Sequence, residues 1–343
     1  MLELSQNKYR LTYNSTRNFK QPNETLSEQQ RQLLEEPLKL LNPVYVTLTE
    51  NLRQSTGLLE PQTKQMMVSS ANRLTERFNE SLIIQTTARQ ALLGRKLELI
   101  EKARKLIETF GLDTKLPSGQ LKDDTFGYLA AINGTWNGPF EIYTGFGASS
   151  GSLGELISYQ GRRRLAEFSG RCNRMQASLG ELRPMPLQES QMLEIFQPSF
   201  CRLLHLEPVG VRKLREGQAI GYRLAERDFL SAQNNPDNQC FCINGTGDNY
   251  CSLNGAIELA PCAYFSPILL TTSSIQLDDR ITNSVANWSP ELVDSSIEGG
   301  QFEFGSLEPN SSQTLILKRL GVPAQVDLTL TLFMKVVRDP QFR

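Results

Sequence analysis

The chain has 343 residues, of which 39% are hydrophobic, so it can bury the core of one large domain or two. Its 36 basic and 37 acidic residues give a net charge of −1, which excludes an overall field that recruits nucleic acid or an anionic membrane. A disordered tail is also excluded, and no nucleic acid is expected among the partners.

Residues 24 to about 111 are predicted to be helical, because good helix formers predominate and apolar residues recur at helical spacing. Met67, Ala71, Leu74 and Phe78 are expected to share one helix face, with Arg73, Glu76 and Arg77 pointing elsewhere. We therefore assign residues 24–115 to a helical subdomain.

A second helix is predicted from Ala88 to Phe110. Its apolar stripe comprises Leu92, Leu99, Leu106 and Phe110, and its basic residues are Arg95, Lys96, Lys102, Arg104 and Lys105. These basic residues have two possible interpretations: they form a solvated helix face or a cationic docking surface.

Beyond Lys115 the pattern changes to strands and turns. Alternating apolar residues predict half-buried antiparallel strands at Phe140–Thr144, Ile220–Leu224 and Val326–Leu332. Residues 116–343 are therefore assigned to an antiparallel β body, and the fold class is α+β.

One motif suggests catalysis, the G-x-S-x-G string from Gly147 to Gly151, which precedes a possible helix at Leu153–Tyr159. A Ser149 nucleophile would need a histidine base, but the only histidine, His205, lies in an apolar run. No phosphate-binding loop, dinucleotide fingerprint or metal-ligand cluster occurs. We therefore expect a binding protein that is not an enzyme and needs no cofactor or metal, with a serine hydrolase as an unlikely alternative.

All six cysteines lie between Cys172 and Cys262, at positions 172, 201, 240, 242, 251 and 262. A zinc site would need C-x2-C pairs or further histidines, and free core thiols would be more scattered. Three disulfides are the favoured reading. The spacing leaves many pairings open, although the turn-rich segment Cys242–Cys251 suits a local bridge.

Seven glycosylation sequons accompany the cysteines. They are Asn14, Asn23, Asn79, Asn133, Asn244, Asn287 and Asn310, of which Asn287 is the least favoured because Pro290 follows its Ser289. Sequons and clustered cysteines together indicate a lumenal or extracellular protein. Yet no run of about 18 apolar residues occurs, and residues 1–16 lack the apolar core of a signal peptide. We expect a targeting or membrane segment outside this sequence.

Several local strings, together with the cysteine separations, resemble the class B scavenger receptors. The strings include Asn235-Pro-Asp-Asn-Gln-Cys-Phe-Cys242, Arg89-Gln-Ala-Leu-Leu-Gly94, Phe126-Gly-Tyr128, Asn133-Gly-Thr135 and Leu307-Glu-Pro309. The resemblance covers most of the chain. It departs from the family at Gln176–Glu181, where an acidic turn is usual.

This resemblance implies the disulfides Cys172–Cys240, Cys201–Cys262 and Cys242–Cys251. It also implies an antiparallel β-barrel-like ectodomain with a helical bundle at its apex and an internal apolar tunnel. Residues 1–23 would supply a barrel strand, and a transmembrane helix would flank each end of the ectodomain.

Receptors of this kind bind lipids, lipoproteins or other lipid-bearing particles and pass lipid through the tunnel to the plasma membrane or the lysosomal or endosomal membrane. Arg73 and Arg77 match the positions of basic ligand-binding residues at the apex, and Lys102, Arg104 and Lys105 are further candidates by charge. The alternative is a receptor that captures protein cargo through the same apex.

Overall fold

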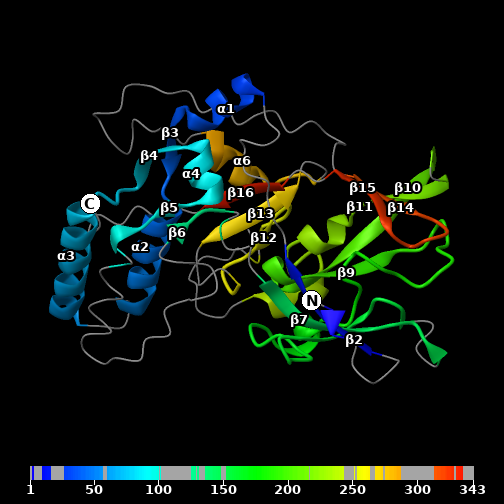
Figure 1. Ribbon diagram of the computed structural model, residues 1–343. Helices are drawn as coiled ribbons and strands as arrows, with labels where there is room; N and C mark the ends of the chain where they lie inside the picture. Colours follow the sequence, from blue (N-terminus) through cyan, green and yellow to red (C-terminus); the bar gives the residue numbers. More distant parts are fainter. Residues whose placement is uncertain are drawn as a thin grey trace. The chain divides into compact units, whose positions relative to one another are not determined.

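The computed structural model describes residues 2–3, 10–16, 27–56, 60–99, 101, 125–128, 130, 136–147, 152–215, 217–242, 251, 253–262, 267–272, 275–286, 313–327 and 330–334 (Figure 1). The chain divides into two compact units. The β unit comprises Met1–Tyr13, Pro139–Ala263 and Ile268–Phe333, and the helical unit comprises Asn14–Gly138, Tyr264–Pro267 and Met334–Arg343. The fold mixes helices and strands, as the α+β prediction requires.

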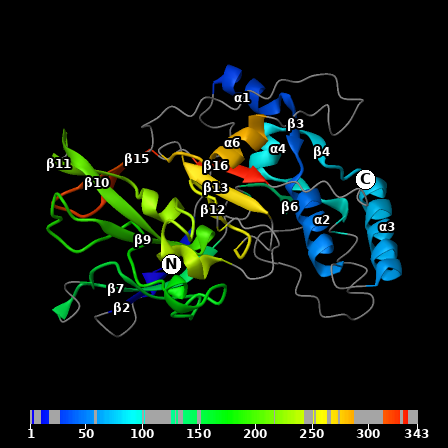
Figure 2. The same ribbon diagram turned by 180° about the vertical axis from the view of Figure 1, so that it is seen from behind.

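A five-stranded antiparallel sheet is the largest element of the β unit. Its strands follow the order β15 (Pro323–Asp327), β14 (Gln313–Leu317), β11 (Gly217–Leu224), β10 (Arg202–Leu214) and β9 (Leu193–Gln197). Figure 2 shows β9 beside β10 from behind. Among the described strands β15 and β9 are the outermost, although Ile195 of β9 also forms a bridge with Ser178, and a core of buried apolar side chains packs against the sheet.

Two smaller sheets complete the unit. One has the order β1 (Leu2–Glu3), β2 (Arg10–Thr16), β7 (Trp136–Tyr143) and β8 (Leu156–Tyr159). The other contains β12 (Ile257–Glu258), β13 (Ile268–Thr272) and β16 (Leu330–Met334), and helix α6 (Asp279–Ala286) follows β13 along the chain.

The predicted strands are confirmed where one face is buried. Phe140 and Ile142 are buried on β7, and Ile220, Tyr222 and Leu224 are buried on β11. These side chains alternate with more exposed ones, apart from the small Gly221, because successive residues of a strand point to opposite faces.

Two predictions for the β body are wrong. Val326 to Leu332 is not one strand, because β15 ends at Asp327 and β16 begins at Leu330 in another sheet, and Val326 is 57% exposed on an edge strand. Residues 156–159 of the possible helix form β8 instead, since they pair with β7. Pairing with a distant strand overrides local helix propensity.

The helical unit also contains strands. Its elements are α1 (Glu28–Glu35), β3 (Pro37–Leu41), α2 (Pro43–Thr56), α3 (Pro61–Arg77), β4 (Ile83–Thr87), α4 (Ala88–Leu93), β5 (Arg95–Lys96) and β6 (Thr125–Phe126). β3 pairs with β4 and β5 with β6, both antiparallel. The prediction of helix from residue 24 to about 111 is therefore wrong at β3, β4 and β5, whereas β6 lies beyond Lys115, where strands were predicted.

The single helix predicted from Ala88 to Phe110 is interrupted, because α4 ends at Leu93 and helical residues resume only at Glu98 and Leu99. Gly94 follows with φ of 119°, a backbone conformation that side-chain-bearing residues rarely adopt, and the chain continues into β5. Leu106 and Phe110 lie outside the described residues.

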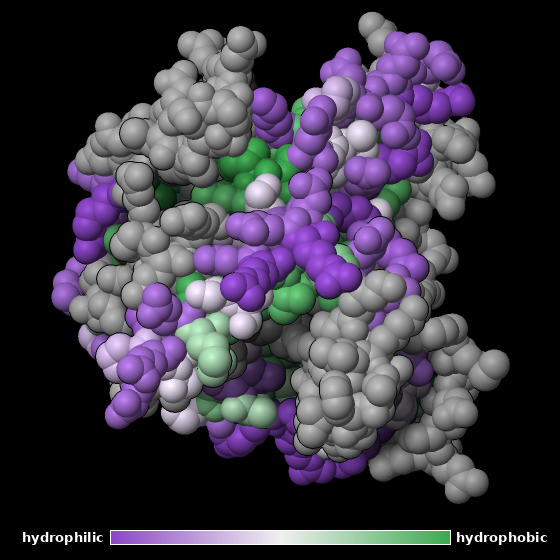
Figure 3. Space-filling view, turned by 90° about the vertical axis from the view of Figure 1, so that its left-hand side faces the viewer, coloured by the Kyte–Doolittle hydropathy of each residue, from purple (hydrophilic) through white to green (hydrophobic). Residues whose placement is uncertain are grey.

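The buried face of α3 differs from the predicted one. Val68 and Thr75 are buried, whereas Met67 and Leu74 are 37% and 48% exposed. Ala71 and Phe78 of the predicted face are half-buried, so the predicted and buried faces overlap and differ by less than the roughly 100° between successive helix residues. Figure 3 views the side of Figure 1 at which α3 lies, and hydrophobic residues border hydrophilic ones on that face.

A buried polar cluster connects α2 to the two strand pairs of the helical unit. Glu80 accepts hydrogen bonds from both terminal nitrogens of Arg95, at 2.8 and 2.7 Å, and from Asn42 Nδ2 at 2.7 Å. The other polar side-chain atom of Asn42, Oδ1, accepts a hydrogen bond from the Val44 N–H at the start of α2. The burial of the Glu80 carboxylate is thus compensated by a paired cation and hydrogen bonds.

We predict that Gly94→Ala lowers the free energy of unfolding by about 1–3 kcal/mol. A Cβ there would lie 2.4 Å from Thr125 Cγ2, in addition to the unfavourable φ. Thermal unfolding under non-reducing conditions measures the effect. Gly161→Ala is the control, because its φ is also positive at 73° but a Cβ meets nothing within 4 Å. Equal losses in the two variants would show that the contact with Thr125 is unimportant.

Candidate functional site

Three disulfide bonds cross-link the segment between Cys172 and Cys262. Cys172 in the 3-10 turn η2 (Gly170–Asn173) pairs with Cys240 in η5 (Pro236–Phe241). Cys201, which directly precedes β10, pairs with Cys262, and Cys242 pairs with Cys251. These are the pairs that the family resemblance implies. All six cysteines are described and none is free, so none remains as a thiol ligand for a metal.

A buried arginine packs among these cross-links. Arg202 is 4% exposed, its guanidinium carbon lies 4.0 Å from the centre of the Phe241 ring, and its Nη2 donates to the Glu258 carbonyl at 3.0 Å. Burial lowers the pKa of Arg202 to about 10, so the group stays charged. The cation and the ring attract each other more strongly when water is excluded.

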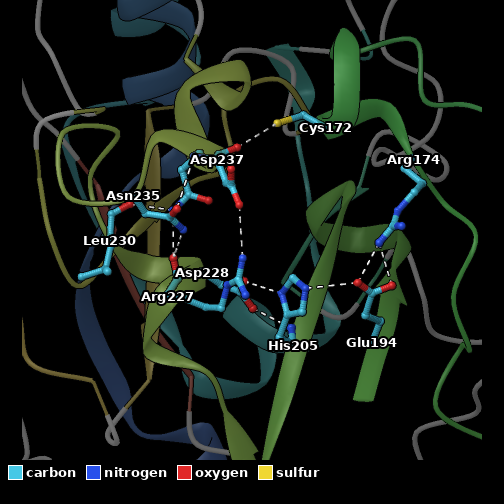
Figure 4. A network of polar contacts seen from close by, with 10 residues as sticks. Cys172, Arg174, Glu194, His205, Arg227, Asp228, Leu230, Asn235 and Asp237 are labelled. Carbon is cyan, nitrogen blue, oxygen red and sulfur yellow. Dashed lines mark hydrogen bonds and ion pairs between the residues drawn. The ribbon is translucent and has the colours of Figure 1, made fainter. Parts of the chain in front are cut away.

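Three residues further along β10, His205 lies between two carboxylates (Figure 4). Its Nδ1 is 2.7 Å from Asp228 Oδ1, and its backbone N–H donates to Asp228 Oδ2 at 2.6 Å. Its Nε2 is 3.3 Å from Glu194 Oε1, and Arg174 contacts both oxygens of Glu194 at 2.7 Å. The network joins β9, β10 and the turn η4 (Glu226–Phe229).

The two carboxylates keep His205 protonated. Hydrogen bonds to Asp228, and secondly to Glu194, raise the pKa of His205 to about 9. The hydrogen bond to His205 in turn lowers the pKa of Glu194. A histidine with both ring nitrogens engaged has no free lone pair to act as a base. Ser149, the nucleophile of the hydrolase alternative, lies outside the described residues.

The stability of the chain should fall as the pH rises through about 9. The pKa of His205 is higher in the folded chain than its ordinary value of 6.5, so its stabilising effect is complete below that value and is lost on deprotonation. We expect His205→Gln to reduce the difference in melting temperature between pH 7 and about pH 10. His205 is the only histidine, so no other imidazole contributes. An unchanged difference in the variant would contradict the assignment.

The motif Asn235–Cys242 has a structural role that sequence reasoning did not identify. The Asn235 side chain accepts from the Asp237 N–H at 3.2 Å, at the start of η5. The Asp237 carboxylate pairs with Arg227 (Figure 4) and with Arg171. Asn238 Nδ2 donates to the Leu230 carbonyl at 2.8 Å. The motif thus positions Cys240 for its disulfide with Cys172.

The β unit also contains an apolar cavity of about 160 Å³. Its lining residues are Leu11, Tyr13, Ile142, Gly154, Leu179, Glu181 and Leu182. Leu11 and Tyr13 of β2 and Ile142 of β7 belong to the apolar side of their sheet, where the tilted rings of Tyr13 and Phe140 lie 5.5 Å apart between centres. Arg10 and Glu141, one residue away on each strand, form an ion pair. The alternation of strand side chains thus separates a polar face from the cavity.

One edge of the cavity is polar. The Tyr13 hydroxyl donates to Glu181 Oε2 at 3.5 Å, and burial, together with the Glu181 charge, raises the pKa of Tyr13, so the phenol stays neutral. Gly154, with φ of 77°, lets the chain at Leu182 approach, since a Cβ would lie 2.4 Å from the Leu182 carbonyl oxygen. Sequence analysis treated Gln176–Glu181 only as a departure from the family, and no pattern there indicated a cavity.

The predicted ligand-binding residues are only partly described. Arg73 and Arg77 are exposed on α3, whereas Lys102, Arg104 and Lys105 lie outside the described residues. Among the sequons, Asn14 and Asn79 are exposed. The other five, Asn23, Asn133, Asn244, Asn287 and Asn310, are also outside the described part.

The described part of the chain also bears on metal binding and on membrane spans. No group of three or more His, Cys, Asp or Glu side chains there has an arrangement that could hold a metal ion. No helix among these same residues combines the length and hydropathy of a membrane span.

Comparison with known proteins assigns the family. The sequence profile of the CD36 family matches residues 1–291, and the chain belongs to this family, whose members are scavenger-type receptors. Sensory neuron membrane protein 2 of Heliothis virescens is 27% identical over 143 residues. That match covers 40% of this chain and 27% of the relative, so the matched segment spans about a quarter of that protein's length.

Proposed function

We propose that this chain is part of the ectodomain of a scavenger-type membrane receptor that binds lipids or lipoproteins. The observation that carries the proposal is membership of the CD36 family over residues 1–291. Disulfides throughout the cysteine-rich segment support an ectodomain in an oxidising compartment, facing outward from the plasma membrane or into a lysosome or endosome.

The apolar cavity supports a path for lipid. Each CH2 group moved from water to an apolar surface contributes about 0.8 kcal/mol, so a chain of such cavities can conduct a lipid that bulk water cannot. In the complete receptor we expect the open sheets to close into a barrel-like body around an apolar tunnel, with a helical bundle at the apex and flanking transmembrane helices. Transport of this kind needs no catalytic residue.

The surface of α3 supports a second role, the capture of particles. Met66, Met67 and Leu74 are exposed on this helix together with Arg73 and Arg77. Exposed apolar side chains beside cations fit the surface of a lipid particle, where anionic head groups border acyl chains. The same surface also suits a protein cargo with an acidic, partly apolar face.

Lipid extraction and mass spectrometry of the secreted, glycosylated protein test the main proposal. We expect co-purified sterol, fatty acid or carotenoid after purification under non-reducing conditions. Extracts of an unrelated secreted glycoprotein from the same cells control for adventitious lipid. A folded, disulfide-intact protein that carries no lipid and takes none up would overturn lipid binding and favour protein cargo.

Charge reversal tests the α3 surface. We expect Arg73→Glu with Arg77→Glu to weaken binding to phosphatidylserine-containing vesicles roughly tenfold or more, since each basic residue near an anionic surface contributes about 1 kcal/mol. The matched control is Arg212→Glu with Arg215→Glu, two exposed arginines at the end of β10 in the β unit. Vesicle co-sedimentation measures both pairs. Equal losses would show that only net charge matters and that α3 is not the binding surface.

A further inference from the structure

The polar edge of the apolar cavity selects among lipid head groups. We propose that this cavity binds the hydroxyl end of a neutral amphiphile, such as a long-chain alcohol, and discriminates against a lipid carboxylate. The inference rests on the proposed lipid-binding function and adds the chemical class of ligand that this cavity takes.

The size and lining of the cavity suit one end of an aliphatic chain. Its walls include Leu11, Ile142, Leu179 and Leu182, and its volume of about 160 Å³ is close to that of an engineered, enclosed apolar cavity of about 150 Å³ that binds benzene. Leu182 is partly exposed and Glu181 is exposed, so the cavity reaches the surface and the remaining chain of a longer ligand can extend outward.

The polar groups of the cavity match a hydroxyl. An ionised Glu181 carboxylate only accepts hydrogen bonds, whereas the neutral Tyr13 phenol both donates and accepts. Their mutual contact is 3.5 Å, the outer limit for a hydrogen bond, so the two groups satisfy each other weakly. A ligand hydroxyl between them can donate to Glu181 and accept from Tyr13.

The charge of the cavity disfavours an acid. No lysine or arginine is among its described lining residues, so a bound carboxylate would face Glu181 without a compensating cation. The nearest basic residue along β2, Arg10, lies on the polar side of the strand and pairs with Glu141 at 3.3 Å. Two like charges about 4 Å apart in water disfavour binding by roughly fivefold, and by more where water is excluded.

The test compares 1-octanol with octanoate, which share a chain length and differ in head group. Binding of each probe to the secreted, glycosylated chain is measured by calorimetry near neutral pH. We expect octanol to bind at least about fivefold more tightly. A charged probe also partitions less well into any apolar site. The test therefore depends on how the ratio of the octanol and octanoate affinities changes between the wild type and the variants.

Glu181→Gln should remove most of the preference for octanol, because octanoate should bind more tightly to this variant. Tyr13→Phe should weaken the binding of octanol by roughly 2- to 10-fold. Glu226→Gln is the matched control, because Glu226 is also an exposed carboxylate of the β unit but does not line this cavity. Leu179→Trp should fill the cavity and abolish binding of both probes.

Three results would overturn the inference. The first is an affinity ratio that is the same in Glu181→Gln and wild type. The second is binding of both probes that survives Leu179→Trp, which would place them elsewhere. The third is that neither probe binds. If the purified chain nevertheless carries lipid, only the cavity assignment fails, whereas a chain without lipid that also binds neither probe would overturn the proposed function as well.

Discussion

The disulfide cross-links around β10 are the constraint on which the arrangement of the β unit depends. Cys201 directly precedes Arg202, and Cys240 and Cys242 flank Phe241, on whose ring the Arg202 guanidinium lies. A buried cation is costly unless its partners are held in place. Covalent links between these segments supply that fixed geometry, and each stabilises the fold further, typically by about 2–4 kcal/mol, chiefly through the unfolded chain.

Two other regions of the β unit, the His205 network and the apolar cavity, differ in their chemistry. The network of His205, Asp228 and Glu194 is fully paired, so its charges hold β9, β10 and η4 together. The cavity between β2, β7 and the loop of Glu181 is apolar, with a single weak polar contact at its edge. The first is a stabilising element, and the second is the cavity that the proposed lipid-binding function would use.

In the helical unit, a helix is correctly predicted, but the face that it buries differs in part from the predicted apolar face. Helix was predicted across α2 and α3 from composition and periodicity, and both helices are present. The buried stripe of α3 nevertheless runs through Val68 and Thr75, because the packing partners of a helix decide which of two neighbouring stripes is covered. As a consequence, Met67 and Leu74 are exposed on the same helix as Arg73.

The sequence by itself determined the family, the cysteine-rich segment, the α+β class and the strands with one buried face, because motifs, cysteine spacing and side-chain periodicity are local properties. Only the tertiary structure decided the strand pairs within the helical region, the break at Gly94 and the division of Val326–Leu332 between two sheets. The same holds for the pairing of His205 with Asp228 and Glu194, and for the cavity that Tyr13 and Glu181 share. These features join residues far apart in the chain, and no local pattern records which distant side chains will meet.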